Sequence, residues 1–142
     1  MAISDETLTA LKHAYQTWHE SHGENVGPML EVMADDVEVT TLPDGANPLE
    51  FSKACYSKAE MTAYLQGLIG DWHLLGVDIE DMVRERDRVV VLLTTSWRNR
   101  RTDKSFESHA AHAWRFRNGY ANQLRLFFDS AKWSEAARAD SL

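Results

Sequence analysis

The 142-residue sequence has one cysteine and no long hydrophobic segment, and each shortage excludes a class of protein. With Cys55 as the single thiol, an intrachain disulfide is impossible, and so is a zinc site built on several cysteines. The longest uninterrupted apolar run, residues 89–93, is far too short to cross a bilayer, and residues 1–20 lack the apolar region of a signal peptide. We therefore expect a cytoplasmic protein with no membrane partner.

Basic side chains are fewer than acidic ones: 15 Lys and Arg against 22 Asp and Glu give a net charge of −7 at pH 7. Because nucleic-acid binding requires a basic surface that neutralises phosphates, we expect no nucleic-acid partner. The basic residues that are present gather in segments 84–88 and 98–104, which have the pattern of strand ends and turns. We interpret them as solvated turns that protect sheet edges, with a groove for an anionic ligand as the alternative.

The length and a composition of 44% hydrophobic and 26% charged residues predict one globular domain spanning residues 1–142, with no repeat or linker. Apolar residues at helical spacing predict a helix over residues 5–21, a short one from Pro28 to about Met33, and a third from Ser57 to about residue 70. Alternation around Val37 and Val39 predicts a short strand between the last two helices.

From residue 72 onward the apolar period changes to two, which predicts strands over 72–84, 88–99, 105–117 and 120–129 joined by short turns. Residues 131–142 are expected to form either a short helix or a frayed tail. Three helices followed by an antiparallel meander predict an α+β domain whose N-terminal helices pack on one face of a curved sheet.

Two more specific expectations follow from the strand pattern. The run 89–93 is apolar on both of its faces, and three helices cannot cover both, so we expect a homodimer through the outer face of the sheet. A two-residue turn at Asn118 and Gly119 would pair Arg117 with Tyr120 and place His112 opposite Arg125 on the next strand.

The most distinctive pattern is a hairpin with a histidine, an aromatic residue, Phe and Arg before a turn glycine, followed ten residues later by Asp. Its members are His112, Trp114, Phe116, Arg117, Gly119 and Asp129. Together with the segment MADDVEV and the helix SKAEMTAYLQGLIGDW, this pattern resembles the SnoaL-like and ketosteroid-isomerase-related branch of the NTF2-like superfamily, over nearly the whole chain. The resemblance implies a cone-shaped fold, in which a strongly curved antiparallel sheet wraps around helices and leaves a cavity at the open end, often in a homodimer.

His112 and Asp129 are the candidate catalytic residues. His112 is either a neutral core histidine with a satisfied hydrogen bond or a general acid/base or oxyanion donor. The resemblance implies the second role, because ketosteroid isomerase holds the protonated acid of its oxyanion hole at the matching position. For Asp129 the resemblance to SnoaL-like cyclases implies proton transfer, and the alternative is a structural carboxylate that holds the C-terminal segment in place or pairs with Arg125. The isomerase's general base matches a position near Thr41, and threonine cannot do that work, so the isomerase mechanism itself is not expected.

Eight further residues are expected to line the cavity and contact a small apolar or aromatic ligand. They are Tyr15, Trp18, Tyr64, Trp72, Trp97, Trp114, Arg125 and Phe127. Core packing is the alternative for the aromatic residues of the helices. Both faces of the last strand carry apolar residues, so its inward face stays open, although the resemblance places Asp129 near the cavity.

The sequence contains no glycine-rich phosphate loop and no set of side chains at metal-ligand spacing, so we expect neither a cofactor nor a metal. The resulting hypothesis is a small-molecule-binding protein, acting as a cofactor-independent isomerase or cyclase on an apolar carbonyl compound by acid/base proton transfer. The alternative is a non-catalytic dimeric module that binds a ligand or a protein.

Overall fold

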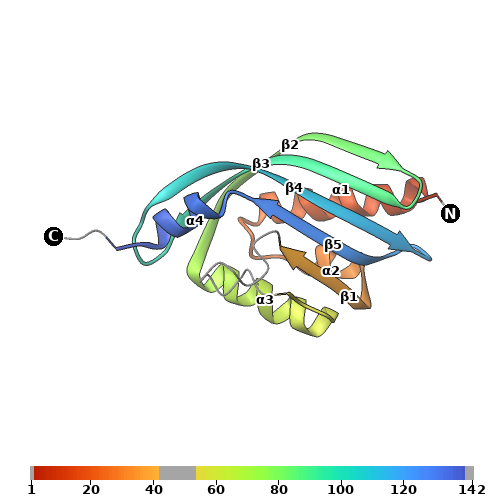
Figure 1. The fold of residues 1–142 in the computed structure, drawn as a ribbon, viewed down its shortest axis with the longest axis horizontal. Helices are drawn as coiled ribbons and strands as arrows, with labels where there is room; N and C mark the ends of the chain where they lie inside the picture. The colour runs from red at the N-terminus through yellow and green to blue at the C-terminus, as the bar shows by residue number, and fades with distance from the viewer. Residues whose placement is uncertain (1, 42–53, 140–142) are drawn as a thin grey trace.

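The computed structural model of the chain describes residues 2–41 and 54–139, and Figure 1 shows its arrangement. The elements in chain order are α1 (Asp5–Glu20), α2 (Gly27–Glu31), β1 (Met33–Thr41), α3 (Lys58–Asp71), β2 (Trp72–Glu85), β3 (Arg88–Asn99), β4 (Ser105–Arg117), β5 (Tyr120–Phe128) and α4 (Ser130–Ala137). The predicted α+β class is confirmed, and the last four strands begin and end within one residue of the expected bounds.

The described strands form one curved sheet in the order β1-β5-β4-β3-β2. Strands β2 to β5 make the antiparallel meander that the period-two pattern predicts, and β1 joins β5 in parallel. Strand β2 departs from regular register against β3 at two places, between Leu74 and Gly76 and between Ile79 and Asp81. Such irregularities bend a strand and increase its twist, so they help the sheet to curve around the helices.

Capping side chains set where the two longer N-terminal helices begin. Ser4 accepts a hydrogen bond from the backbone N–H of Thr7 at the start of α1, and Ser57 accepts one from Glu60 at the start of α3. From α1, Leu11, Ala14, Tyr15 and Trp18 are buried against the sheet side of the core. Because these residues are three or four positions apart, they lie on one face of the helix, and this face fills the cone.

Helix α4 resolves the choice between a helix and a frayed tail at the C-terminus. It lies at one end of the sheet, where β5 ends (Figure 1). Its Trp133 is buried and packs against Trp72 and Trp97, with ring centroids 4.7 and 4.9 Å away. Aromatic contacts of this kind add to the area that burial removes from water, so α4 is part of the core.

Two local expectations are wrong by small shifts. The hairpin turn pairs Arg117 with Tyr120 as expected, but a bulge between Arg115 and Phe116 moves the register by one residue. His112 is therefore opposite Leu126 instead of Arg125. The short second helix ends before Met33, which is the first residue of β1, because a five-residue helix has too few hydrogen bonds to extend without favourable packing.

Candidate ligand-binding site

Three polar groups, of the buried Tyr15 and Trp114 and the partly buried His112, form a chain of hydrogen bonds inside the cone. The indole Nε1–H of Trp114 donates to the hydroxyl oxygen of Tyr15 at 3.0 Å, and the same hydroxyl lies 2.6 Å from Nδ1 of His112. Helix α1 supplies Tyr15, whereas His112 and Trp114 are two residues apart on β4 and so share its inward face. The helix and the sheet are thus joined by polar contacts within an apolar core.

The direction of these bonds follows from what each group can donate. An indole N–H only donates, so Trp114 uses Tyr15 as an acceptor, and the Tyr15 proton then needs an acceptor of its own. The unprotonated Nδ1 of His112 provides it, which places the imidazole proton on Nε2. Among the described residues no group hydrogen-bonds with Nε2. His112 therefore has one N–H available for a bound molecule.

Burial determines the protonation state of both groups. It lowers the pKa of His112 to about 4, because a charged imidazolium loses its hydration inside the core. It also raises the pKa of Tyr15 far above its ordinary value, against a smaller opposing effect of the Trp114 hydrogen bond. At neutral pH the pair consists of a neutral phenol and a neutral imidazole.

His112 lines a small internal space, the inner cavity, of about 80 Å³. Liquid water occupies about 30 Å³ per molecule, so this volume has room for about three waters or for one compact organic group. Five of the eight expected lining residues line the inner cavity together with His112. They are Tyr15, Trp18, Tyr64, Trp97 and Trp114.

The rest of the lining is apolar and was not among the expected ligand contacts. Three methionines, Met29, Met33 and Met61, come from the N-terminal elements, and unbranched thioether side chains adapt easily to different shapes. Leu124, Leu126 and Phe128 share the inward face of β5. Their alternate positions in the sequence already indicated that these three side chains lie on one face of the strand. Leu65, Leu68 and Trp133 complete the lining.

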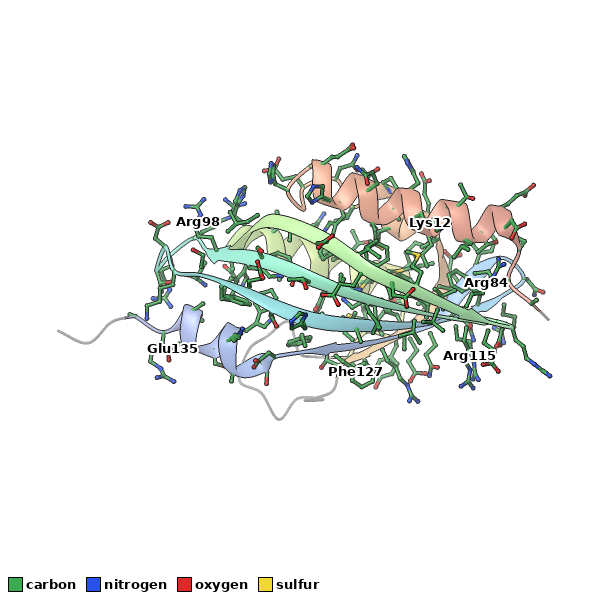
Figure 2. All side chains as sticks on the ribbon, turned by 90° about the horizontal axis from the view of Figure 1, so that it is seen from above. Lys12, Arg84, Arg98, Arg115, Phe127 and Glu135 are labelled. Atoms are coloured by element: carbon green, nitrogen blue, oxygen red, sulfur yellow. The ribbon has the colours of Figure 1, made fainter. Side chains whose placement is uncertain are left out.

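Arg125 and Phe127 do not line the inner cavity, so these two expectations are wrong. Both have odd numbers on β5, and alternation turns them to the outer face once Leu124 and Leu126 point inward. Arg125 is exposed. In Figure 2, helix α1 with Lys12 lies along one side of the sheet, and Phe127 lies toward the other.

Asp129 also lies outside the inner cavity, and its role there is structural. It is exposed and lies directly after β5, as the N-cap of α4. Its carboxylate accepts a hydrogen bond from the backbone N–H of Lys132 at 3.3 Å. The structure thus favours the structural alternative for Asp129, because a carboxylate satisfies the free N–H groups and the positive end of a helix.

A second and larger hollow, the outer cleft, lies on the other side of α3. Its volume is about 810 Å³, and it is bounded by α3, by the last residue of β3 with the two residues after it (99–101), and by the end of α4. Tyr64 and Leu68 line both hollows, so they form the wall between them. Trp72, expected to line the cavity, lines the outer cleft and not the inner cavity.

Within residues 2–41 and 54–139, no three His, Cys, Asp or Glu side chains are grouped so that they could hold a metal ion. In the same part of the chain, no helix is long and apolar enough to cross a membrane.

The family of this protein is established by its sequence and its fold together. The SnoaL-like domain family matches residues 11–122, which include α1 from Leu11 onward, strands β1 to β4, the first residues of β5 and the Tyr15–His112–Trp114 chain. The protein belongs to the SnoaL-like domain family. No curated protein matches the chain.

Solved structures give the same fold at low sequence identity. An NTF2-like protein of unknown function from Burkholderia pseudomallei is 22% identical with a TM-score of 0.81, over 96% of this chain and 100% of that one. TerC, co-crystallised with polyporic acid, is 21% identical with a TM-score of 0.72, over 92% of this chain and 96% of that one. A protein with a ketosteroid isomerase-like fold from Catenulispora acidiphila, in complex with trimethylamine, is 11% identical with a TM-score of 0.72, over 96% of this chain and 95% of that one. The NTF2-like fold expected from the resemblance is confirmed.

Proposed function

We propose that this protein binds a small, mainly apolar molecule with a carbonyl oxygen, and that Nε2–H of His112 donates a hydrogen bond to that oxygen. The observation that carries the proposal is the 2.6 Å contact between the Tyr15 hydroxyl and Nδ1 of His112. It orients the imidazole and leaves its proton on Nε2, which has no partner in the part of the chain that the structure describes. Apolar walls with few convergent polar groups are typical of small-molecule sites. Two proteins of similar fold were crystallised with small molecules, trimethylamine and polyporic acid.

The lowered pKa makes His112 a better donor than base. A general base works best when its pKa is near the working pH, and a pKa of about 4 makes His112 a weak base at pH 7. A neutral imidazole N–H held in place can instead stabilise negative charge that develops on a carbonyl oxygen. We infer that a catalytic role for His112 would be the polarisation of a ketone during enolisation, as a cofactor-independent isomerase or cyclase requires.

A second candidate function is a non-catalytic ligand-binding module. Among the described residues that line the inner cavity there is no carboxylate, and Asp129, the expected proton carrier, lies outside it. Donation by His112 alone is sufficient for binding, whereas isomerisation also needs a base. Binding is therefore the function that the geometry supports best, and catalysis is the more demanding extension.

We also propose a homodimer through the outer face of the sheet. Leu92, Ala111 and Phe127 are cross-strand neighbours on β3, β4 and β5 and form an apolar row across that face. Leu92 is 39% exposed, although leucine is among the residues most often buried. A second copy with the same row would remove this surface from water.

The test of the binding proposal is a titration of the ¹⁵N-labelled protein with acetone, which is small enough for the inner cavity, followed by the Nε2 resonance of His112. We expect a saturable shift in wild type, and no shift in the resonances of the cavity when His112→Gln is titrated, since the amide side chain cannot reproduce the imidazole geometry. His109→Gln is the matched control, because His109 is on the same strand but outside the inner cavity. An unshifted His112 at saturating acetone contradicts the proposal.

A further inference from the structure

Helix α3 presents a face of unusually small residues to the outer cleft. Ala63, Gly67 and Gly70 are spaced four and three residues apart, so they lie on one side of the helix, and all three line the outer cleft. Glycine in a helix interior is less favourable than alanine. A Cβ atom added at Gly67 would meet no atom of the described residues within 4 Å, so packing against them does not require a glycine there. Its effect is to keep the cleft open against the helix backbone.

Two hydrogen-bond donors that line the same cleft have no partner among the described residues. The side chain of Asn99 is part of a residue only 5% exposed, and its Oδ1 accepts from the backbone N–H groups of Arg101 and Thr102, each at 3.0 Å. Its Nδ2 then remains without a partner within the described chain. The hydroxyl of Tyr64 likewise has no partner within the described chain, and desolvation raises its pKa, so it stays a neutral donor. Both donors line the outer cleft and are therefore available to a molecule that enters it.

The charged residues of the outer cleft balance one another. Arg100 donates from Nε to the carbonyl oxygen of Ile69 at 2.9 Å, and Arg101 donates to the carbonyl oxygen of Ala137, so each guanidinium stabilises the end of a helix. Two carboxylates, Glu60 and Asp71, line the same cleft. With two charges of each sign, the cleft favours a neutral ligand over an anion.

We propose that the inner cavity and the outer cleft are two parts of one site for an elongated, neutral ligand with at least two oxygen acceptors. One end of the ligand carries a ketone past Tyr64 and Leu68 to His112, and the body lies along Gly67 with an oxygen near Tyr64 and Asn99. The inner cavity of about 80 Å³ is too small for such a molecule, whereas the outer cleft of about 810 Å³ accommodates its body. This inference rests on the proposed function of His112 and adds the class of ligand.

The first experiment compares three ketones by calorimetry and by the Nε2 resonance of His112. The probes are acetone, para-benzyloxyacetophenone and its all-carbon analogue para-phenethylacetophenone, in which a methylene replaces the ether oxygen. We expect the benzyloxy compound to bind more tightly than both others, because it alone fills the cleft and accepts from its donors. Tyr64→Phe is expected to weaken the benzyloxy compound roughly three- to tenfold, the value of one hydrogen bond, and to leave the all-carbon analogue unchanged.

The second experiment fills the space above Gly67. Gly67→Ala is expected to raise the melting temperature, because alanine favours the helix, and at the same time to weaken binding of the benzyloxy compound. Gly67→Leu is expected to abolish that binding and to leave the response of His112 to acetone intact. Gln66→Leu adds the same side chain at the neighbouring, exposed position of α3 outside the cleft and should change neither.

The outcomes separate this inference from the proposed function. If Gly67→Leu binds the benzyloxy compound as well as Gln66→Leu does, or if the ether and all-carbon compounds bind equally, the two-part site is wrong while the role of His112 stands. If His112 responds to none of the three ketones in wild type, both proposals are wrong. Loss of the long ligand alone, with acetone binding retained, supports the two-part site.

Discussion

Tyr15 and His112 are 97 residues apart in the sequence, and their side chains meet at 2.6 Å in the core. Their rings are also nearly parallel, with centroids 5.7 Å apart and an interplanar angle of 26°. The contact joins the first helix to the fourth strand, and through the Tyr15 hydroxyl it also satisfies the indole N–H of Trp114. One hydroxyl group thus orients the residue on which the proposed function depends.

Removing that hydroxyl should destabilise the protein measurably. In Tyr15→Phe, Nε1 of the buried Trp114 loses its acceptor and Nδ1 of His112 loses its donor. We expect the free energy of unfolding to fall by about 1–3 kcal/mol, the usual cost of buried polar groups left unpaired. Urea denaturation at pH 7 measures it. Tyr120→Phe, at a residue 55% exposed, is the control and should stay close to wild type.

Acidification should weaken the fold through His112. Its pKa falls from the ordinary 6.5 to about 4 in the folded state, so between these values the unfolded chain binds a proton that the folded protein does not. Stability therefore decreases as the pH falls from about 6.5 to about 4, by up to about 3 kcal/mol in total, and is unaffected by this group above that range.

The measurement is a series of urea denaturations between pH 7 and pH 4 on wild type and on His112→Gln. Other groups titrate equally in the two proteins, so the difference between their slopes isolates His112. A direct titration of the His112 ring resonances gives the folded-state pKa. A midpoint near 6.5 would show that this imidazole is hydrated and would contradict the lowered pKa.

Two substitutions at Asp129 distinguish a helix-capping role from a catalytic one. Asp129→Ala removes the acceptor for the Lys132 N–H, and we expect a loss of about 0.5–2 kcal/mol in stability. Asp129→Asn keeps an equally good N-cap and should be close to neutral. Both variants should bind para-benzyloxyacetophenone as wild type does. A fold-stable Asp129→Asn protein that loses binding or turnover would restore the proton-transfer role.

The proposed dimer is tested on the apolar row of the outer face. Leu92→Glu places a carboxylate at a cross-strand neighbour of Ala111, where a partner would have to bury it. We expect wild type to sediment as a dimer at micromolar concentration and Leu92→Glu as a 16 kDa monomer. The exposed Tyr56, replaced by Glu, is the control and should remain dimeric. A monomeric wild type excludes this interface.

The regular elements were predictable because their signals are local. The capping serines Ser4 and Ser57, the helical spacing behind them and the period-two segments each depend on residues close in sequence. The bounds of β3 and β4 follow from the pattern alone, and the family resemblance supplied the cone. The bulge between Arg115 and Phe116 has no comparable local signal, and it changes which residue is opposite His112.

The site was predictable only in part, for the same reason. Apolar patterns indicate that Tyr15, His112 and Trp114 lie inside, but they do not distinguish the two faces of β5, both of which carry apolar residues. Packing decides between those faces, because the core has room for Leu124 and Leu126 and leaves Arg125 in solvent. Arg125 and Phe127 were expected in the cavity, although they lie on the outer face of β5.

By itself, then, the sequence determined the elements, their order, the α+β class and the inward placement of His112, since periodicity and capping are properties of neighbouring residues. Only the tertiary structure decided that Tyr15 orients His112 and that Tyr64 separates two hollows of very different size. Each of these relationships joins residues on different elements. Their distances depend on how the sheet curves and how the helices pack into it, and no pattern within a single element specifies that.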